Sequence, residues 1–412
     1  MPFMIAGIDV HKRVLMVAVA DASVGESDLD FQCRRFGTTT SELKHVAAWL
    51  GERGVREVVM ESTAQYWKPI WLALEGPMQL YLAQAWSNRA PRGRKADFKD
   101  AQRLARRHMC GELTLSFVPE AEQRHMRSLT RRRVQLSGDR VRLQNQLEAL
   151  LEEMRVKLSS MVTDLLGVSA RRILWALAAG ECDPERLAEL GDARLKCTRE
   201  QMADALGCPP PPVLRRLLRL VLEQVDFLDR QVEELARLIA ETMQGQQEVV
   251  ARLAEVPGIR IVAAQQILAE IGPQAAAFPS AAQLASWMGA CPGREESAGV
   301  NHSGHCPKGN RYLRRTLCQA AQAAVRTKNS HFQSVFRRLL PRLGYAKAVW
   351  AVVRHMIEVI WKILRTGVPY QERGSVTTPQ ALKRRIQRLT KELRDAGYTV
   401  EIKPPAPAAA LV

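Results

Sequence analysis

The chain has 412 residues, and its 60 Lys and Arg residues outnumber its 43 Asp and Glu residues, which gives a formal net charge of +17. This length allows two or three domains, each with a core of its own. The charge favours a polyanionic partner but does not distinguish nucleic acid from a ribosomal or membrane surface. The eight cysteines form no CxxC pair, which argues against a disulfide framework and for a reducing, cytoplasmic compartment.

Neither an export signal nor a membrane span is expected. The opening apolar run lacks basic residues and reaches Asp9 too early for a signal peptide. The apolar stretch 345–364 is interrupted by Lys347, Arg354, His355, Glu358 and Lys362, so it is too polar to cross a bilayer.

The first hundred residues predict an α/β domain. The expected order is strand 3–10, strand 14–20, strand 29–36, helix 41–50, strand 55–60, helix 67–74, strand 80–84 and helix 97–109. Short turns between the first three strands indicate an antiparallel meander. This order is that of the ribonuclease H-like fold, in which acids from the first strand, the fourth strand and a later helix converge.

Four acids occupy those positions. Asp9 lies in the first strand, Glu61 ends the fourth, and Asp97 and Asp100 lie on the last helix, where residues three apart share one face. Carboxylates gathered in this way suit Mg²⁺, which completes its shell with phosphate oxygens. The sequence therefore predicts a magnesium site for work on phosphodiesters. His11, beside the first acid, is expected to contact an acid or a phosphate and not the metal.

Two helical seams follow. The first is partial, whereas the second alternates steps of four and three residues throughout, as in a coiled coil. The first seam comprises Leu136, Leu143, Leu147, Leu150 and Met154, and the second comprises Leu214, Leu218, Val221, Val225, Leu228, Val232, Leu235 and Ile239. The pattern fits an internal antiparallel helix pair as well as a dimer interface. The prolines at 209–212 break the chain before the second seam.

Beyond residue 247 the sequence predicts short helices with Gly and Pro turns. The segment 253–268, LAEVPGIRIVAAQQIL, resembles one helix-hairpin-helix unit, in which a tight turn presents backbone N–H groups to a phosphate. Arg260 stands where that motif has its last glycine. Beyond residue 370 we expect a short basic helix, 382–394, and a loose tail.

Several of these segments together resemble the DEDD insertion-sequence transposases, a group of bridge-RNA-guided serine recombinases. The resemblance rests on GIDVHKR, VVMEST and KADFKDAQRLA and, much later, on CPGREES and KGNRYLR, in the family's order. It implies a RuvC-like domain joined through a coiled coil to a helical transposase domain with a nucleophilic serine. The four acids then match Asp9, Glu61, Asp97 and Asp100.

The same resemblance places the nucleophile at Ser297, five residues after Pro292. The chain departs from the family pattern in having Ala64 after the Glu-x-Thr segment and Ala298 directly after the serine. Ser303, which Gly304 follows, is the alternative nucleophile, and the spacing from Pro292 favours Ser297. A loop hydroxyl can attack a phosphate when a base or metal assists its deprotonation.

Basic residues in two segments, one before the last helix of the α/β domain and one after the serine, are expected to bind nucleic acid. Those predicted to do so are Arg92, Arg94, Lys95, Lys308, Arg311, Arg314 and Arg315. The arginine runs 131–133 and 337–342 are usually solvated faces, but here they are expected to line a groove, with Trp86 and Tyr312 available for stacking. A structural zinc site at Cys291, His302, His305 and Cys306 is disfavoured because the spacing matches no standard finger.

The sequence thus predicts an α/β plus all-α protein with a ribonuclease H-like (RuvC-like) domain at 1–125, a coiled-coil region at 126–246, a transposase domain at 247–370, and a basic helix and tail at 371–412. The expected function is Mg²⁺-dependent DNA strand exchange through a phosphoserine, on donor and target DNA. A structured guide RNA is expected to choose the target. A homodimer or homotetramer in the bacterial cytoplasm, near the nucleoid, is expected. The rival is a metal-dependent junction resolvase that uses water, and a third class is a non-catalytic nucleic-acid-binding protein.

Overall fold

The computed structural model describes residues 3–24, 29–61, 64–88, 98–291, 296–297, 300–301, 306–372, 374 and 379–402. The chain forms two units, Met1–Glu120 and Ala121–Val412, and we describe each by itself. The first unit ends close to the predicted limit at residue 125. The finer division of the second unit at residues 246 and 370 stays a prediction.

The N-terminal unit is a five-stranded mixed sheet with helices on both faces. Its elements are β1 (Met4–Val10), β2 (Val14–Asp21), β3 (Gln32–Gly37), α1 (Thr40–Glu52), β4 (Val55–Glu61), α2 (Trp67–Leu74), β5 (Gln79–Ala83), the 3₁₀ helix η2 (Ala85–Asn88) and α3 (Lys99–Met109). The strand order is β3-β2-β1-β4-β5. The first three strands are antiparallel, and β4 and β5 run parallel to β1.

Alternation of side chains along the strands divides the core between the two faces of the sheet. Ile8, Val58 and Met60 point to the face that packs against Trp49 of α1 and Ile70 of α2. The intervening residues point to the opposite face, which α3 covers. Because side chains alternate along a strand, each central strand is apolar on both sides. The predicted order of strands and helices is confirmed, with η2 as an unpredicted addition.

In the part that the structure describes, the C-terminal unit is helical apart from one small hairpin. Its elements are α4 (Ala121–Glu153), α5 (Leu158–Met161), α6 (Val168–Ala179), α7 (Pro184–Glu189), α8 (Arg199–Ala205), α9 (Pro212–Thr242), η3 (Gln244–Gln246), α10 (Gln247–Ala254), α11 (Ile261–Ile271), α12 (Ala281–Met288), β6 (Glu296–Ser297), β7 (Val300–Asn301), α13 (Arg311–Ala324), α14 (His331–Thr366) and α15 (Pro379–Asp395).

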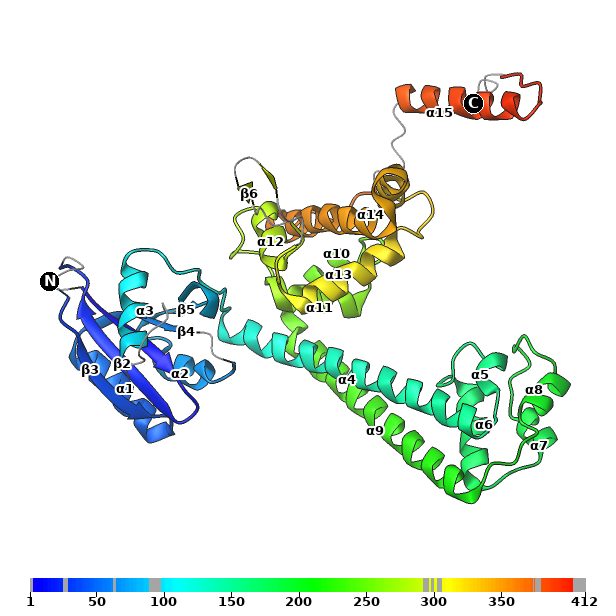
Figure 1. Ribbon diagram of the computed structural model, residues 1–412, viewed down its shortest axis with the longest axis horizontal. Coiled ribbons are helices and arrows are strands. Elements are labelled where there is room, and N and C mark those ends of the chain that lie inside the picture. Colours follow the sequence, from blue (N-terminus) through cyan, green and yellow to red (C-terminus); the bar gives the residue numbers. More distant parts are fainter. Residues whose placement is uncertain are drawn as a thin grey trace. The chain divides into compact units, whose positions relative to one another are not determined.

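Helices α4 and α9 form a long antiparallel pair that carries α5 to α8 at one end (Figure 1). Arg140 of α4 bonds Asp229 of α9 at 2.6 Å. Leu218 and Val225 of the second seam are buried against Leu147 and other residues of this end. Within one chain, the second seam therefore packs in an internal antiparallel helix pair. Helix α9 begins at Pro212, a position where proline is tolerated because its missing N–H has no helical partner.

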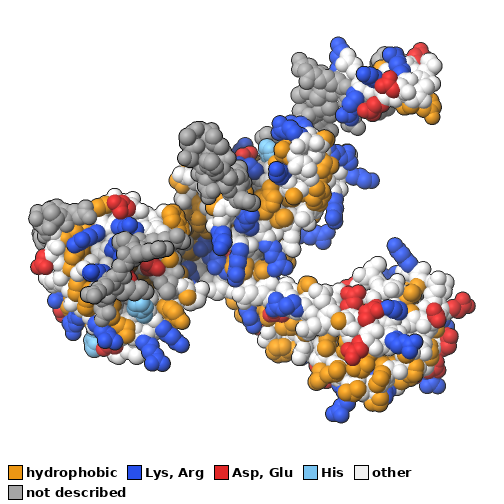
Figure 2. All heavy atoms as spheres, in the orientation of Figure 1, with side chains coloured by type: hydrophobic (Ala, Val, Ile, Leu, Met, Phe, Trp, Pro, Cys, Tyr) orange, Lys and Arg blue, Asp and Glu red, His pale blue; other side chains and the backbone are white. Residues whose placement is uncertain are grey.

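Helices α10 to α14 form the remaining body of this unit. Helices α13 and α14 pack together, α12 packs on α14, and α11 packs on both α4 and α13. Helix α14 is interrupted at Gly344, whose φ of 71° is left-handed, three residues after Pro341. Figure 2 shows Lys and Arg side chains gathered over the part of the surface that α13 and α14 form. Among the helices that the structure describes, none is both long and apolar enough to span a bilayer.

Candidate functional site

Asp9 is the last residue but one of β1, and Glu61 is the last residue of the neighbouring parallel strand β4. The register pairs Gly7 with Val59 and Ile8 with Met60, so Asp9 and Glu61 follow at the next step. Aligned residues of adjacent strands point to the same face of a sheet. The two carboxylates therefore project side by side, on the face that α3 covers.

Gly7 brings α3 against this face. A Cβ at Gly7 would lie 2.1 Å from the carbonyl oxygen of Ala101 and 2.9 Å from the backbone N of Ala105. Only a residue without a side chain permits this approach. Asp100 precedes Ala101 in the first turn of α3, so the contact at Gly7 carries Asp100 towards Asp9, two residues further along the same strand.

The electrostatics of Asp9 agree with this placement. Burial raises the pKa of the Asp9 carboxyl, His11 acts against that shift, and the charge of Asp100 adds to it. His11 Nε2 lies 3.1 Å from Asp9 Oδ2, as the predicted contact with an acid requires. A neighbouring carboxylate raises a pKa because two like charges disfavour joint ionisation. A bound cation would relieve both the burial cost and the repulsion.

A chain of hydrogen bonds links Glu61 to Asp100. The sequence did not predict this chain. Asn88, 2% exposed, donates from Nδ2 to Glu61 Oε2 at 2.9 Å. Arg103 Nε donates to Asn88 O and Oδ1, each at 3.3 Å, while its Nη2 bonds Asp100 Oδ1. The spacing of Asp100 and Arg103 could have indicated their pair. Nothing local marks Asn88, because η2 and the tertiary fold bring it to Glu61.

The fourth acid, Asp97, lies outside the described residues, as do Arg92, Arg94 and Lys95. Helix α3 begins at Lys99, so the helical spacing that places Asp97 beside Asp100 stays a prediction. Among the described residues, no group of three or more His, Cys, Asp or Glu side chains is arranged to hold a metal ion. Of the disfavoured zinc cluster, His302 and His305 lie outside the described residues, so that expectation stays a prediction.

Ser297 lies in the small hairpin of the C-terminal unit, where β6 and β7 pair antiparallel and Ser297 is opposite Val300. Pro292 and Ser303, on which the choice of nucleophile depends, are outside the described residues. The hairpin belongs to the segment 290–308 between α12 and α13, which we call the serine loop. Its assignment as the nucleophile loop stays a prediction.

The two ends of the serine loop meet at a pair of glycines. Gly289, with a φ of +78°, ends α12, and a Cβ at Gly309 would lie 2.1 Å from the carbonyl oxygen of Met288. Arg314 of α13 donates to the carbonyl oxygen of Gly289, and its guanidinium lies 4.5 Å from the ring centre of Trp350. The base of the loop is therefore closed by backbone contact and held by one arginine.

The basic residues predicted to bind nucleic acid differ in their surroundings. Lys308, Arg311 and Arg315 are exposed, whereas Arg314 is engaged at the loop base. Arg337, Arg338 and Arg342 are also exposed. The exposed cations remain available for phosphates.

Arg131 and Arg133, which the sequence predicts to line a nucleic-acid groove, are engaged by acceptors of the same unit, and the groove role stays a prediction. Arg133 is 5% exposed and donates to Gln265 Oε1 at 2.8 Å and to the carbonyl oxygen of Val262 at 3.1 Å. Arg131 bonds both carboxylate oxygens of Glu270. Both arginines supply donors that buried acceptors of α11 need. Arg132 of the same run is exposed.

The two aromatics predicted to stack on bases also differ. Trp86 is 59% exposed and therefore accessible. The ring of Tyr312 already has two cations beside it, because the guanidinium carbons of Arg131 and Arg311 lie 4.8 and 4.9 Å from its centre. Cation–π contacts of this kind occupy the ring, so Tyr312 contributes to packing between α4 and α13.

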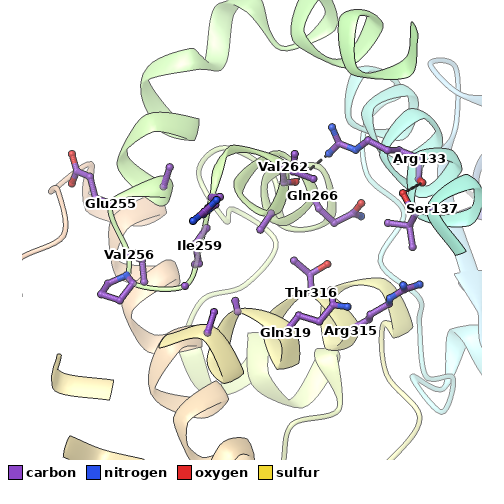
Figure 3. A pocket seen from close by; sticks show the side chains of 18 of the residues that line it. Arg133, Ser137, Glu255, Val256, Ile259, Val262, Gln266, Arg315, Thr316 and Gln319 are labelled. Carbon is purple, nitrogen blue, oxygen red and sulfur yellow. Dashed lines mark hydrogen bonds between the residues drawn. The ribbon is translucent and has the colours of Figure 1, made fainter. Parts of the chain in front are cut away.

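A short turn joins α10 to α11, which pack together, at the place where the sequence predicts a helix-hairpin-helix unit. Gly258, with a φ of +85°, approaches α13 so closely that a Cβ would lie 2.1 Å from the carbonyl oxygen of Ala320. No side chain caps the start of α11 at Arg260. A cleft of about 950 Å³ opens beside this turn, with Arg133, Gln266 and Arg315 on its walls (Figure 3). An uncapped helix start beside basic side chains is suited to a phosphate.

Each unit contains a segment that matches a known transposase family. Residues 6–156 match a DEDD-type family of the IS110 group described as "Transposase", and residues 250–337 match the "Transposase IS116/IS110/IS902 family". The matches cover the acids and the serine loop respectively, and together they include more than half of the chain.

Curated relatives agree. A "Probable family 20 transposase" of Pseudomonas aeruginosa is 24% identical over 76% of this chain and 85% of its own length. An "Insertion element IS110 uncharacterized 43.6 kDa protein" of Streptomyces coelicolor is 23% identical over 58% and 62%. An "Insertion element IS900 uncharacterized 42 kDa protein" of Mycobacterium paratuberculosis is 25% identical over 60% and 65%. The chain therefore spans less than two thirds of the last two relatives.

Solved structures give weaker likenesses. The Thermus thermophilus RuvC structure aligns with 28% of this chain and 100% of its own, at 14% identity and a TM-score of 0.22. The structure of T. thermophilus RuvC in complex with Holliday junction substrate covers 28% and 99%, at 12% identity and a TM-score of 0.21. Scores this low do not establish a shared fold.

The two family matches and the curated relatives support the function of an insertion-element transposase. The chain belongs to the IS110 family of DEDD transposases.

Proposed function

We propose that this transposase exchanges DNA strands through a covalent phosphoserine, with Ser297 as the nucleophile and with the acids of the N-terminal unit at the scissile phosphate. The observation that carries the proposal is the convergence of Asp9 and Glu61 at adjacent strand ends, with α3 carrying Asp100 to the same face. We also propose that the N-terminal unit has a ribonuclease H-like, RuvC-like fold. It is supported by the sheet order and by the DEDD family match.

The proposed chemistry needs no nucleotide cofactor. Ser297 Oγ loses its proton and forms a bond to phosphorus, while the bond between phosphorus and one strand oxygen breaks and that oxygen takes up a proton. The free hydroxyl of a second strand later attacks the phosphoserine and releases Ser297. Each step replaces one phosphoester with another, so the bond energy is conserved.

The acids suit a hard divalent cation. Asp9, Glu61, Asp97 and Asp100 would hold Mg²⁺ through carboxylate oxygens, and the raised pKa of Asp9 fits a site whose charges need compensation. Bound Mg²⁺ would stabilise the charge that develops on phosphate oxygens. Arg103 and Asn88 hold Asp100 and Glu61 in place through their hydrogen bonds. His11 positions the Asp9 carboxylate in the same way.

Nucleic acid is proposed to bind both units. Arg92, Arg94 and Lys95 precede α3, while Lys308, Arg311 and Arg315 surround the start of α13, with the uncapped start of α11 nearby in the same unit. A structured guide RNA would choose the target by base pairing, which accords with a basic protein that lacks an evident base-reading motif. Because the acids and Ser297 belong to different units, a homo-oligomer could assemble the site from different subunits.

The test is a search for a DNA strand covalently linked to the protein. Protein, candidate RNA and labelled DNA are incubated with Mg²⁺ and denatured, and linked strands are separated on a denaturing gel. Wild type and Ser303→Ala are expected to give the linked strand, and Ser297→Ala is expected to bind RNA and DNA but give none. Loss in Ser303→Ala alone would move the nucleophile to Ser303.

The alternative is a metal-dependent resolvase in which water attacks. It is favoured by the fact that the candidate acids all belong to the N-terminal unit and need no residue of the serine loop. It predicts DNA cleavage by Ser297→Ala with no linked strand in any variant. A non-catalytic binding protein predicts no cleavage by wild type and no effect of changing Asp9 or Ser297.

A further inference from the structure

Glu270 is a carboxylate that the proposed chemistry does not use. It lies near the end of α11, and its side chain is 0% exposed. A charge so deeply buried is tolerated only when it is paired and hydrogen-bonded. Gln266 of the same helix donates to Glu270 Oε1 at 3.2 Å, and the other partners come from two helices that are far apart in sequence.

The first partner helix is α4, which starts the C-terminal unit. Arg131 bonds Glu270 with two parallel hydrogen bonds, Nε to Oε1 and Nη2 to Oε2, each 2.7 Å long. Arg127, 8% exposed, lies 3.5 Å from Oε2 and donates to the carbonyl oxygens of Ala269 and Glu270. A paired fork of this kind fixes orientation as well as charge. Glu270 thereby fixes the position of α11 along α4.

The second partner helix is α13, which follows the serine loop. Asn310 Nδ2 donates to Glu270 Oε2 at 2.6 Å. The Oδ1 atom of the same side chain accepts from the backbone N–H groups of Tyr312 and Leu313, at 3.1 and 3.0 Å, and so caps α13. One amide therefore joins the buried carboxylate to the first turn of the helix.

Asn310 directly follows Gly309, which forms the base of the serine loop with Gly289. Arg314, one turn into α13, holds the carbonyl oxygen of Gly289. A shift of the start of α13 would therefore move both ends of the loop. Glu270 thus contacts α4 and the loop base together, through its hydrogen bonds with Arg131 and Asn310.

We propose that Glu270 is a positioning residue for strand exchange: it holds the start of α13, and with it the serine loop, at a fixed place relative to α4. The inference rests on the proposed role of the serine loop. Glu270 acts through Asn310, and it touches neither DNA nor the scissile phosphate. Catalysis is sensitive to such placement, since a displacement of about 1 Å can slow a reaction about a hundredfold.

The test removes the hydrogen bond between Asn310 and Glu270 without removing the cap of α13. Asn310→Ser keeps a side-chain oxygen that can cap α13, but the shorter side chain loses the amide that reaches Glu270. The matched control is Ser330→Ala, which removes the cap of α14 in the same unit, where Ser330 Oγ accepts from Gln333 N. Thermal unfolding shows whether the two variants lose similar stability. Glu270→Gln, which keeps shape and removes charge, is the stronger variant.

Two measurements are made on the full-length protein. One is the single-turnover rate at which the linked strand forms at saturating DNA, beside the Kd for DNA. The other is hydrogen exchange at the amides of Gly289 and Ala290, at the loop base. We expect Asn310→Ser and Glu270→Gln to slow formation of the linked strand by about tenfold to a hundredfold. Both variants should leave the Kd for DNA within about twofold and speed hydrogen exchange at the loop base. Ser330→Ala should do none of these.

An equal slowing in Ser330→Ala, or a wild-type rate in Asn310→Ser, overturns the positioning role. If wild type forms no linked strand, the serine mechanism fails. Hydrogen exchange alone then tests whether Glu270 positions the loop base. Faster exchange at Gly289 and Ala290 in Asn310→Ser, with no change in Ser330→Ala, supports the positioning role independently of that failure. Unchanged exchange in both variants overturns it.

Discussion

The two units place their functional helices by the same contact but treat charge in opposite ways. In the N-terminal unit Gly7 lies against Ala101 and Ala105 of α3, and in the C-terminal unit Gly258 lies against Ala320 and Ala324 of α13. In both, a glycine lets a helix approach at backbone distance. The helix then carries Asp100 in one unit and the residues that follow the serine loop in the other.

The difference lies in where the acids are. In the N-terminal unit burial and the charge of Asp100 raise the pKa of the Asp9 carboxyl, and Asp100, although it is paired with Arg103, stays 41% exposed. In the C-terminal unit Glu270 is fully buried, and Arg127 and Arg131 neutralise it. A site that is to hold a cation keeps an acid accessible to solvent, whereas a site that holds helices in place buries its acid and neutralises it internally.

The largest effect is expected at the exposed acid. Asp100→Asn should leave folding and nucleic-acid binding unchanged and lower strand exchange by about a hundredfold or more, as when one group aimed at a transition state is removed. The measurement is product formation in Mg²⁺. The control is Asp139→Asn, because Asp139 and Arg142 form the same i, i+3 pair on α4. Normal exchange by Asp100→Asn would remove this acid from the proposed metal site.

The paired charges should differ strongly in their contribution to stability. Arg131→Met leaves Glu270 buried with one partner fewer and should cost about 3–5 kcal/mol in the free energy of unfolding. Arg103→Met breaks a pair with an acid that is 41% exposed and should cost about 1 kcal/mol or less. Hydrogen exchange, which resolves the two units, measures both changes. Equal costs would contradict the contrast drawn between the units.

The shared glycine contact predicts parallel losses. Gly7→Ala and Gly258→Ala place a Cβ 2.1 Å from a backbone oxygen and should each destabilise their unit by about 1–3 kcal/mol through overpacking. Gly51→Ala is the control, because nothing lies within 4 Å of its added Cβ, and it should be neutral or stabilise α1 by up to about 1 kcal/mol. Thermal unfolding tests all three, and a neutral Gly7→Ala would show that α3 can move without cost.

The smallest effect is expected from a single surface cation. Lys308→Gln should weaken binding to all DNA sequences alike and lower the slope of log K against log salt by about 1. Lys157→Gln is the control, because Lys157 is paired with Glu152 on the surface, and it should leave the slope unchanged. Binding is measured by titration at several salt concentrations. Identical slopes for wild type and Lys308→Gln would place Lys308 outside the nucleic-acid surface.

Much of the architecture could be predicted because it rests on local patterns. Short apolar runs predicted the strands around Asp9 and Glu61, and the proline run predicted the break before α9. The seam from Leu214 to Ile239 predicted a paired helix, but its pattern could not name the partner. The structure supplies α4 of the same chain.

The site was less predictable where partners are distant in sequence. Arg131 and Arg133 have the composition of a basic surface, yet they bond acceptors on α11 more than a hundred residues away. Asn88 reaches Glu61 from a 3₁₀ helix that no periodicity marks. In each case the side chain's role depends on which acceptor the fold presents to it.

The sequence by itself determined the order of elements and the candidate acids Asp9, Glu61 and Asp100, because strand and helix periodicity depend on near neighbours. Only the tertiary structure decided that α3 carries Asp100 to the face of Asp9, and that Glu270 joins α4 to the start of α13. Those contacts depend on backbone approach at Gly7 and on burial of Glu270, which are properties of packed elements and not of any one segment.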